Sequence, residues 1–355
     1  MAALILQGSP SLAPSKVADR LAANVVDLGG SGKDNKFGSG RVEAHGLCDG
    51  QVASIVGTDS AETLSGTSKR DVIAGYGGGD VIKGRDGNDL ICAGKGFDTV
   101  YGGKGNDEMR GQDGSDVLLG GPGSDKYYGG DGDNTASFAN SAAAVVVDLN
   151  AGTATGEGTD TLSAILNVFG SPFDDHIQGS GAGNSIKGMD GHDQLLGGDG
   201  PDELIGGDGG DELMGEDGAD VLAGKKGADT LRGGKGSDLL IGGPHPDDIR
   251  GGNGDDTVSY EDAPGIVTVR LDKRKAFGAW ALDQLLAIEN VIGSRFADTL
   301  VGDDLANIIT GRAGDDHLRG GPGDDTIHGQ GGFDEAHGGG GLDLCLTVEI
   351  VSGCE

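Results

Sequence analysis

The chain has 355 residues, of which 74 are glycine, and its 58 acidic and 26 basic side chains give a formal net charge of −32. Glycine is about three times as frequent as its usual share of roughly 7%. Only 4% of the residues are aromatic, which excludes one large conventional core. The glycines do not recur every third residue, which excludes collagen, and the acidic charge argues against nucleic-acid binding. No apolar run approaches 18 residues, so we expect no membrane span.

The first 46 residues differ in composition from the rest and contain two short predicted helices. The ranges are Ala2–Gln7 and Ser15–Val26, and the second places Val17, Leu21 and Val25 on one face after Pro14. The segment Met1–Leu6 is too short for a signal peptide and no basic residue precedes it. We therefore interpret 1–46 as a segment separate from the repeats that follow.

The second half of this segment carries a family resemblance. It reads VVDLG at 25–29 and GKDNKFGSGRVEA at 32–44. This resembles the tail of subtilisin-like serine proteases, whose catalytic serine would stand just upstream of Met1. The family's catalytic motifs have no counterpart here, because the only Gly-Thr-Ser, at 66–68, lies inside a repeat. The resemblance implies an inactive remnant or a mis-chosen start codon; the alternative is a helical cap for the first repeat block.

From residue 57 the chain repeats with a period of nine, as in GGKGNDEMR from Gly102 and GGPGSDKYY from Gly120. Position six is aspartate in 21 of 25 nonads, position eight is apolar or nearly so in all, and position four is glycine in 18. A disordered chain would not keep three columns in phase, so disorder is excluded. The predicted domains are 1–46, 57–137 (nine nonads), the spacer 138–169, 170–259 (ten nonads), the spacer 260–292, 293–346 (six nonads) and the C-terminal cap 347–355.

The columns predict both a fold and a chemistry. Glycine allows the positive φ of a tight turn, so that carbonyl oxygens can point inward and a carboxylate can close the ring. Oxygen-only ligands in a turn suit a hard cation of the size of calcium. The other three residues form a short strand that buries position eight, and stacked turns complete a narrow core.

The nonads resemble RTX (haemolysin-type) calcium-binding repeats. The resemblance implies an all-β fold, a parallel β-roll in three blocks with β-hairpin-like spacers and a short helical N-terminal segment. It also implies Ca²⁺ between each turn and its counterpart 18 residues on; the alternative is a glycine-rich solenoid without metal. The implied ligands are Asp80, Asp89, Asp98, Asp107, Asp116, Asp125, Asp193, Asp202, Asp211, Asp220, Asp229, Asp238, Asp256, Asp316, Asp325, Asp334 and Asp343.

The first two nonads of each block depart from the pattern at position four. The residues there are Ser60, Lys69, Phe173, Ala182, Phe296 and Leu305. Two nonads make one turn of a β-roll, so we expect each pair to cap its block and to bind calcium weakly or not at all. The nonad GGPHPDDIR is also doubtful as a calcium loop, because His245 replaces glycine.

The two spacers resemble each other. Each has an alternating run, AVVVDL at 144–149 and IVTVRL at 266–271, and each ends in a similar return to the repeat. Alternation bounded by Gly and Asn predicts strands, in the form of a hairpin. The alternative is a binding function for the spacers; they offer no catalytic group.

Four cysteines suit an oxidising compartment and allow three pairings. Resemblance to the paired cysteines of exported relatives favours Cys48–Cys92, and we favour Cys345–Cys354 for the other two. The alternative is four free thiols. No CxxC or HxxxH pair points to zinc.

We therefore predict a non-enzymatic, extracellular calcium-binding protein, because RTX proteins as a family are exported. A second hypothesis is that the chain is the C-terminal folding and secretion module of a subtilisin-like protease. A third, an ice-binding adhesive, lacks a threonine ladder at position three, where Asp86, Lys95 and Lys104 stand. The sequence identifies no macromolecular partner.

Overall fold

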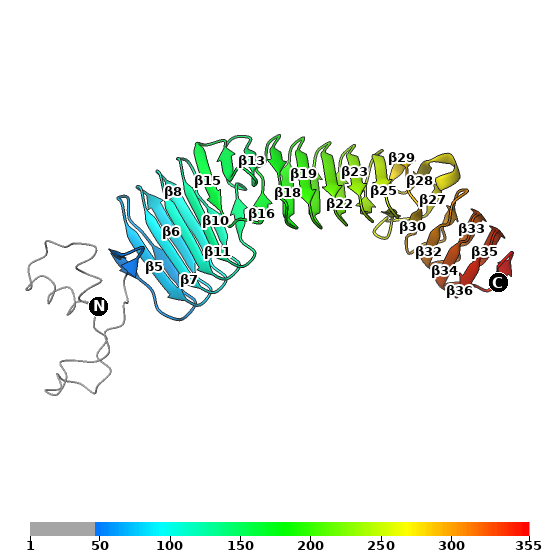
Figure 1. Ribbon diagram of the computed structural model, residues 1–355, viewed down its shortest axis with the longest axis horizontal. Coiled ribbons are helices and arrows are strands. Elements are labelled where there is room, and N and C mark those ends of the chain that lie inside the picture. Colours follow the sequence, from blue (N-terminus) through cyan, green and yellow to red (C-terminus); the bar gives the residue numbers. More distant parts are fainter. Residues whose placement is uncertain (1–46, 355) are drawn as a thin grey trace, which may run out of the picture. The chain divides into compact units, whose positions relative to one another are not determined.

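The computed structural model describes residues 47–354, so the helices expected in 1–46 and the protease-like segment 25–44 lie outside the described residues. The described chain is all β apart from one 3-10 turn, η1 (Leu271–Lys273). It divides into two compact units at Asn134/Thr135, each a stack of parallel strands (Figure 1). No helix among these residues is long and apolar enough to cross a membrane.

In the first unit, each strand pairs in parallel with the strand 18 residues later, as Val81–Asp86 pairs with Thr99–Lys104. Two nonads therefore make one turn of the roll. The first ladder is β4 (Thr63–Ser65), β6 (Val81–Asp86), β8 (Thr99–Lys104) and β10 (Val117–Leu119). The second ladder is β3 (Ile55–Val56), β5 (Val72–Gly77), β7 (Leu90–Lys95), β9 (Glu108–Asp113) and β11 (Lys126–Asp131). A small antiparallel pair, β1 (Leu47–Cys48) and β2 (Gln51–Val52), precedes them.

In the second unit, one ladder runs without interruption through the second and third repeat blocks, because β26 pairs directly with β30. Its strands are β12 (Thr135–Ser137), β16 (Asn167–Phe169), β18 (Ser185–Asp190), β20 (Glu203–Asp208), β22 (Val221–Lys226), β24 (Leu239–Ile241), β26 (Thr257–Ser259), β30 (Asn290–Ile292), β32 (Ile308–Ala313), β34 (Thr326–Gly331) and β36 (Leu344–Leu346). The facing strands are β17 (His176–Gln178), β19 (Gln194–Asp199), β21 (Glu212–Asp217), β23 (Thr230–Lys235), β25 (Asp248–Asn253), β31 (Thr299–Val301), β33 (His317–Pro322), β35 (Glu335–Gly340) and β37 (Ile350–Ser352). These two blocks therefore form one roll, a point that the sequence left open.

Each spacer forms three antiparallel strands, so the predicted hairpin is confirmed and has one strand more than expected. The first contains β13 (Val146–Asp148), β14 (Thr153–Thr155) and β15 (Thr159–Ser163); the second contains β27 (Val267–Arg270), β28 (Lys275–Gly278) and β29 (Ala281–Leu286). The strands β13 and β27 also pair in parallel with β17 and β31. The spacers thus enter the stack as strands of the roll.

Position eight forms the core, as predicted. Every leucine of this column in the second block, such as Leu195, Leu204 and Leu213, has no exposed surface. The flanking side chains at positions seven and nine point outward because side chains alternate along a strand. A single turn buries one such side chain from each of its two strands, so stability depends on the stacking of many turns.

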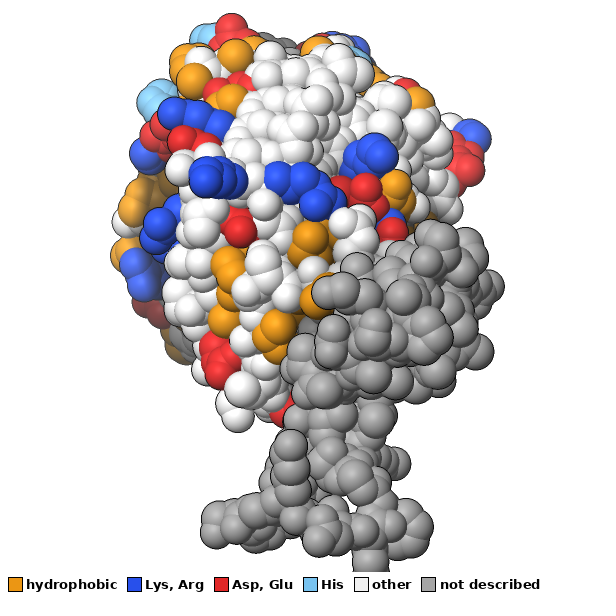
Figure 2. All heavy atoms as spheres, turned by 90° about the vertical axis from the view of Figure 1, so that its left-hand side faces the viewer, with side chains coloured by type: hydrophobic (Ala, Val, Ile, Leu, Met, Phe, Trp, Pro, Cys, Tyr) orange, Lys and Arg blue, Asp and Glu red, His pale blue; other side chains and the backbone are white. Residues whose placement is uncertain are grey.

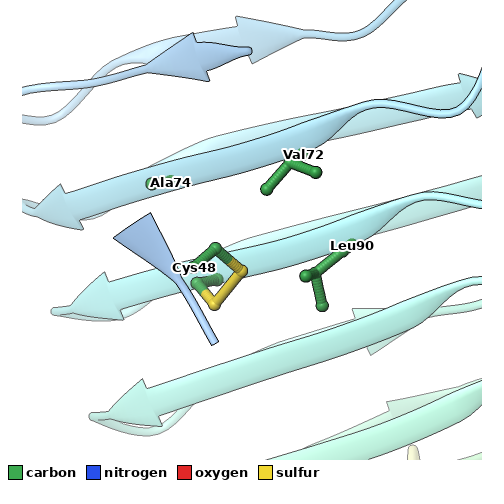
Figure 3. Close-up of a cluster of buried hydrophobic side chains, with 5 residues drawn as sticks. Cys48, Val72, Ala74 and Leu90 are labelled. Atoms are coloured by element: carbon green, nitrogen blue, oxygen red, sulfur yellow. A yellow bond between two sulfur atoms is a disulfide. The ribbon is translucent and has the colours of Figure 1, made fainter. Parts of the chain in front are cut away.

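Disulfides join both predicted pairs. Cys48–Cys92 ties β1 to β7 in the first unit, and Cys345–Cys354 ties β36 to the C-terminal end in the second. Cys48 packs with Val72, Ala74 and Leu90 in a small buried cluster outside the main column (Figure 3). Both bridges lie near the ends of the repeat array, where a solenoid has only one neighbouring turn.

The outer surface mixes both charges. Figure 2 shows lysine and arginine side chains close to aspartate and glutamate side chains on one face. One such pair is Lys95 with Asp113, at 3.0 Å between Nζ and Oδ2, and both side chains are exposed. Exposed pairs of this kind contribute about 0–1 kcal/mol, so they do not determine the fold.

Candidate metal centre

The aspartates at position six form continuous columns inside the roll. Apart from Asp71, Asp175 and Asp298 at the block starts, each one uses its Oδ1 atom to accept the backbone N–H of the position-six residue 18 positions earlier. Asp211 accepts from Asp193 at 2.9 Å, and Asp229 accepts from Asp211 at 2.8 Å. These aspartates are at most 3% exposed, apart from Asp71 at 7%. The columns therefore bury one carboxylate per nonad at the end of each strand.

The second carboxylate oxygen of these residues is buried and accepts no hydrogen bond from the described residues. The aspartates with this feature are Asp80, Asp89, Asp98, Asp107, Asp116, Asp193, Asp202, Asp211, Asp220, Asp229, Asp238, Asp247, Asp256, Asp316, Asp325, Asp334 and Asp343. Asp125 lies in the same column and accepts the N–H of Asp107 through Oδ1. A buried oxygen without a partner costs about 1–3 kcal/mol, more when charged, so a repeated feature of this kind points to a bound cation.

The glycine at position one leaves space beside this oxygen. A Cβ on Gly215 would lie 2.2 Å from Asp220 Oδ2 and 2.6 Å from the carbonyl oxygen of Gly233 on the next turn. A Cβ on Gly206 would meet Asp211 Oδ2 and the carbonyl of Gly224 at 2.2 and 2.8 Å. The carboxylate oxygen and a backbone carbonyl of the following turn therefore face one small space, and both are ligand types that calcium prefers.

The electrostatics of the columns also favour a cation. Burial, with added repulsion from neighbouring aspartates of the same column, raises the pKa of Asp193, Asp202 and Asp316 to about 7. Burial likewise raises the pKa of Asp107 and Asp116 to about 6. The backbone N–H donated to each carboxylate opposes this shift but does not cancel it. The ionised form is therefore disfavoured wherever no cation compensates it.

These shifts predict how the calcium-free protein responds to pH. The pKa of these five aspartates is higher in the roll than in the unfolded chain, where it is near 3.8. Protonation of these aspartates therefore favours the calcium-free roll. This contribution to stability is fully present below about pH 4 and is lost as the pH rises through 6–7. Protein freed of calcium on a chelating resin should therefore show more β structure by circular dichroism at pH 5 than at pH 7.5, where we expect it to be unfolded. An equal or smaller content of β structure at pH 5 would contradict this interpretation of the columns.

The opening nonads of each block differ in the way expected of caps. In Asp71, Asp175 and Asp298 the second carboxylate oxygen accepts the backbone N–H of the residue four positions earlier. The hydroxyl of that Thr or Ser also donates to the carboxylate. Two other caps carry Asn184 and Asn307 in place of aspartate. The capping nonads therefore satisfy their position-six side chain without an ion.

Several residues of the columns lie outside the set predicted from the sequence. Asp247, which was set aside because of His245, has the same unpaired Oδ2, and His245 adopts the positive φ (95°) of the glycines it replaces. Columns also end on acidic residues outside the nonad frame. Asp283 accepts the N–H of Asp247, and Glu289 accepts that of Asp256. The one signal for these residues is that the last backbone N–H of each column needs an acceptor.

Asp283 ends its column without leaving an unpaired oxygen. Its Oδ1 accepts the N–H of Asp247 at 3.1 Å, and its Oδ2 accepts the hydroxyl of the buried Tyr260 at 2.8 Å. The spacer tyrosine thus supplies the donor that Ser and Thr supply in the caps. Glu349 also ends a column, because its Oε2 accepts the N–H of Asp334 at 2.7 Å.

The donor set consists of widely spaced carboxylates and many backbone carbonyls. Within residues 47–354, no three His, Cys, Asp or Glu side chains form a cluster that could hold a metal ion. Each turn contributes one aspartate per side, so the other ligands would be main-chain oxygens. Such a set fits calcium and does not fit zinc, which selects sulfur and nitrogen donors.

The comparison with known families agrees with this chemistry. The sequence matches the RTX calcium-binding nonapeptide repeat, described in units of four copies, over residues 56–136, 169–258 and 292–345. No curated protein matches the chain. The matched residues make up more than half of the sequence, and they contain every aspartate with an unpaired Oδ2. The chain therefore belongs to the RTX calcium-binding repeat family, whose repeats bind calcium ions.

Proposed function

We propose that this is an exported, non-enzymatic protein whose β-roll folds when calcium binds to its aspartate columns. The observation that carries the proposal is the repetition of a buried carboxylate oxygen without a hydrogen-bond donor, beside a glycine at position one in every nonad of this kind except that of Asp98, which has Ala93. In one nonad this could be a local defect of packing. Its repetition over two units of stacked turns supports a set of equivalent cation sites.

Coupling of binding to folding follows from the charges. The chain has a formal net charge of −32, and folding lines up aspartates in buried columns. Without a cation, repulsion and desolvation oppose the roll; a bound divalent cation compensates both. Because the unfolded chain has no preformed site, the free energy of calcium binding contributes directly to folding.

Export is proposed on physical grounds. Calcium in the cytosol is too scarce to fill sites of the low affinity typical of extracellular modules, with a Kd of roughly 10⁻⁴–10⁻³ M. The two disulfides also suit an oxidising compartment. On this proposal the chain is unfolded before export and folds where calcium is abundant.

Replacement of Asp211 by asparagine tests the role of the columns. Asn can keep an oxygen that accepts the N–H of Asp193 but loses the charged second oxygen. We expect a lower cooperativity of calcium-induced folding and a midpoint calcium concentration up to about tenfold higher, which corresponds to about 1.4 kcal/mol. The measurement is circular dichroism during a calcium titration.

The matched control is Asp199→Asn, because Asp199 is exposed at position three of a turn and the substitution removes the same charge. Its titration should stay close to that of the unmodified protein. Equal effects of the two substitutions would show that net charge and not the column governs folding, and would contradict the proposal.

A second candidate function rests on the sequence at 25–44, which resembles the tail of subtilisin-like proteases. In that case the roll would be the folding and secretion module of a larger enzyme. An in-frame GTSMAxP segment encoded upstream of Met1 would support this function, and its absence would favour the non-enzymatic protein.

A further inference from the structure

The second residue of each nonad adopts one of two backbone conformations. In nineteen nonads its φ is positive, and eleven of these residues are glycines, such as Gly207 at 131°. The other eight are Tyr76, Arg85, Gln112, Met189, Glu216, Lys225, Arg312 and Gln330, with φ between 74° and 93°. Residues with a side chain rarely adopt this conformation, so the surrounding turn must impose it.

The six capping nonads have the opposite conformation. Their second residues are Thr58, Thr67, Ser171, Ser180, Ser294 and Asp303, and none of these has a positive φ. In all six, the backbone N–H of this residue donates to the side chain at position six of its own nonad, for example at 2.6 Å from Ser294 to Asp298 Oδ2 and 2.7 Å from Ser180 to Asn184.

In the regular nonads the same N–H points elsewhere. The N–H of Gly103 donates to the carbonyl of Gly120 at 2.8 Å, and that of Lys225 donates to the carbonyl of Gly242 at 3.0 Å. Both acceptors are position-one residues of the next turn on the same side. One donor therefore has two alternative acceptors, the aspartate of its own nonad or the turn above it.

The unpaired oxygens follow this division. All seventeen aspartates with an unpaired Oδ2 belong to nonads with a positive φ at position two, and the two remaining nonads of that conformation hold Asp125 and Asn134. No aspartate in a capping nonad has an unpaired Oδ2. The correspondence holds in the other 23 nonads, including those in which position two is not glycine.

We propose that the residue at position two is a positioning residue that decides whether its nonad binds calcium. With a positive φ, its N–H bonds the next turn and leaves the aspartate oxygen for the ion. With a negative φ, its N–H, helped by a Ser or Thr hydroxyl where one is present, occupies that oxygen and the turn closes without metal. This inference rests on the proposed calcium-dependent folding and assigns the metal-free turns within it.

The proposal makes each capping turn a metal-free start for its block. Ser and Thr favour the negative-φ conformation because their hydroxyls bond nearby backbone and side-chain groups in turns. In the nonad of Ser294, the hydroxyl lies 2.9 and 3.0 Å from the two oxygens of Asp298. The carboxylate there has three donors before any ion is considered, counting the N–H of Val267.

The test is to convert this cap into a regular nonad. In the double variant Ser294→Gly/Phe296→Gly the loop reads GGRGAD, which restores glycine at positions two and four. The matched variant Ser294→Ala/Phe296→Gly has the same change at position four but keeps a residue with a Cβ at position two. Crystals of both full-length variants and of the unmodified protein, grown in calcium, are compared by anomalous difference density.

We expect one additional calcium beside Asp298 only in the variant with glycine at position 294, together with a positive φ at that residue. Density beside Asp298 in both variants would assign the effect to position four, and density in neither would show that position two does not control binding; either result overturns the inference. The calcium sites at Asp316 and Asp334 serve as the internal control. Their absence from all three crystals would instead refute the proposed function.

Discussion

Removal of calcium should abolish most of the β structure of this protein. In EGTA at pH 7.5, the far-ultraviolet circular dichroism spectrum is expected to be that of an unfolded chain, and added calcium should restore the β spectrum cooperatively. The physical reason is the set of buried aspartates whose second oxygen has no donor in the roll. A shift from pKa 3.8 to about 7, as for Asp202, corresponds to roughly 4 kcal/mol against the ionised, folded form at neutral pH. The columns repeat this penalty at several aspartates, and domains are usually stable by only about 5–15 kcal/mol.

Magnesium is the control for this experiment. It demands a near-ideal octahedron of ligands at 2.0–2.1 Å and loses its water reluctantly, whereas calcium accepts irregular sets of oxygens. Magnesium at the same concentration should therefore leave the chain unfolded. A spectrum that is rich in β structure and indifferent to EGTA would mean a metal-independent solenoid, and the aspartates would not be ligands.

The periodic part of this fold could be predicted from the sequence because each column has one physical role. An apolar residue every ninth position, such as Leu204 and Leu213, must be buried, and the structure buries both completely. The aspartates in phase with them were correctly expected on the inside. The period of 18 residues between paired strands follows from two nonads per turn.

The remaining features depend on contacts that no period reveals. The pairing of Asp283 with Tyr260 joins two parts of a spacer 23 residues apart, and neither residue belongs to a nonad. The continuity of the second and third blocks depends on the pairing of β26 with β30 across that spacer. Asp247 was set aside because histidine disfavours positive φ, yet the stacked turns on either side impose that conformation on His245.

The space beside the aspartates can be tested separately from their charge by a single methyl group. Gly206 has no positive φ, so alanine meets no conformational barrier there, but its Cβ would lie 2.2 Å from Asp211 Oδ2 and 2.8 Å from the carbonyl oxygen of Gly224. We expect Gly206→Ala to destabilise the calcium-bound roll by about 1–3 kcal/mol. The midpoint calcium concentration should rise by about tenfold for each 1.4 kcal/mol. The measurements are urea unfolding at saturating calcium and a calcium titration followed by circular dichroism.

Gly340→Ala is the matched control, because a Cβ on Gly340 would have no atom within 4 Å and this glycine also lacks a positive φ. It should change the free energy of unfolding by no more than about 0.5 kcal/mol. In Gly206→Ala, Asp211 cannot move away from the new methyl group without losing its hydrogen bond from Asp193. The carboxylate of Asp211 and the carbonyl of Gly224 must therefore separate. Equal midpoint calcium concentrations for the two variants would mean that the space between the Asp211 carboxylate and the carbonyl of Gly224 holds no ion. A raised midpoint calcium concentration for Gly206→Ala alone would support an ion where the unpaired oxygen and that carbonyl meet.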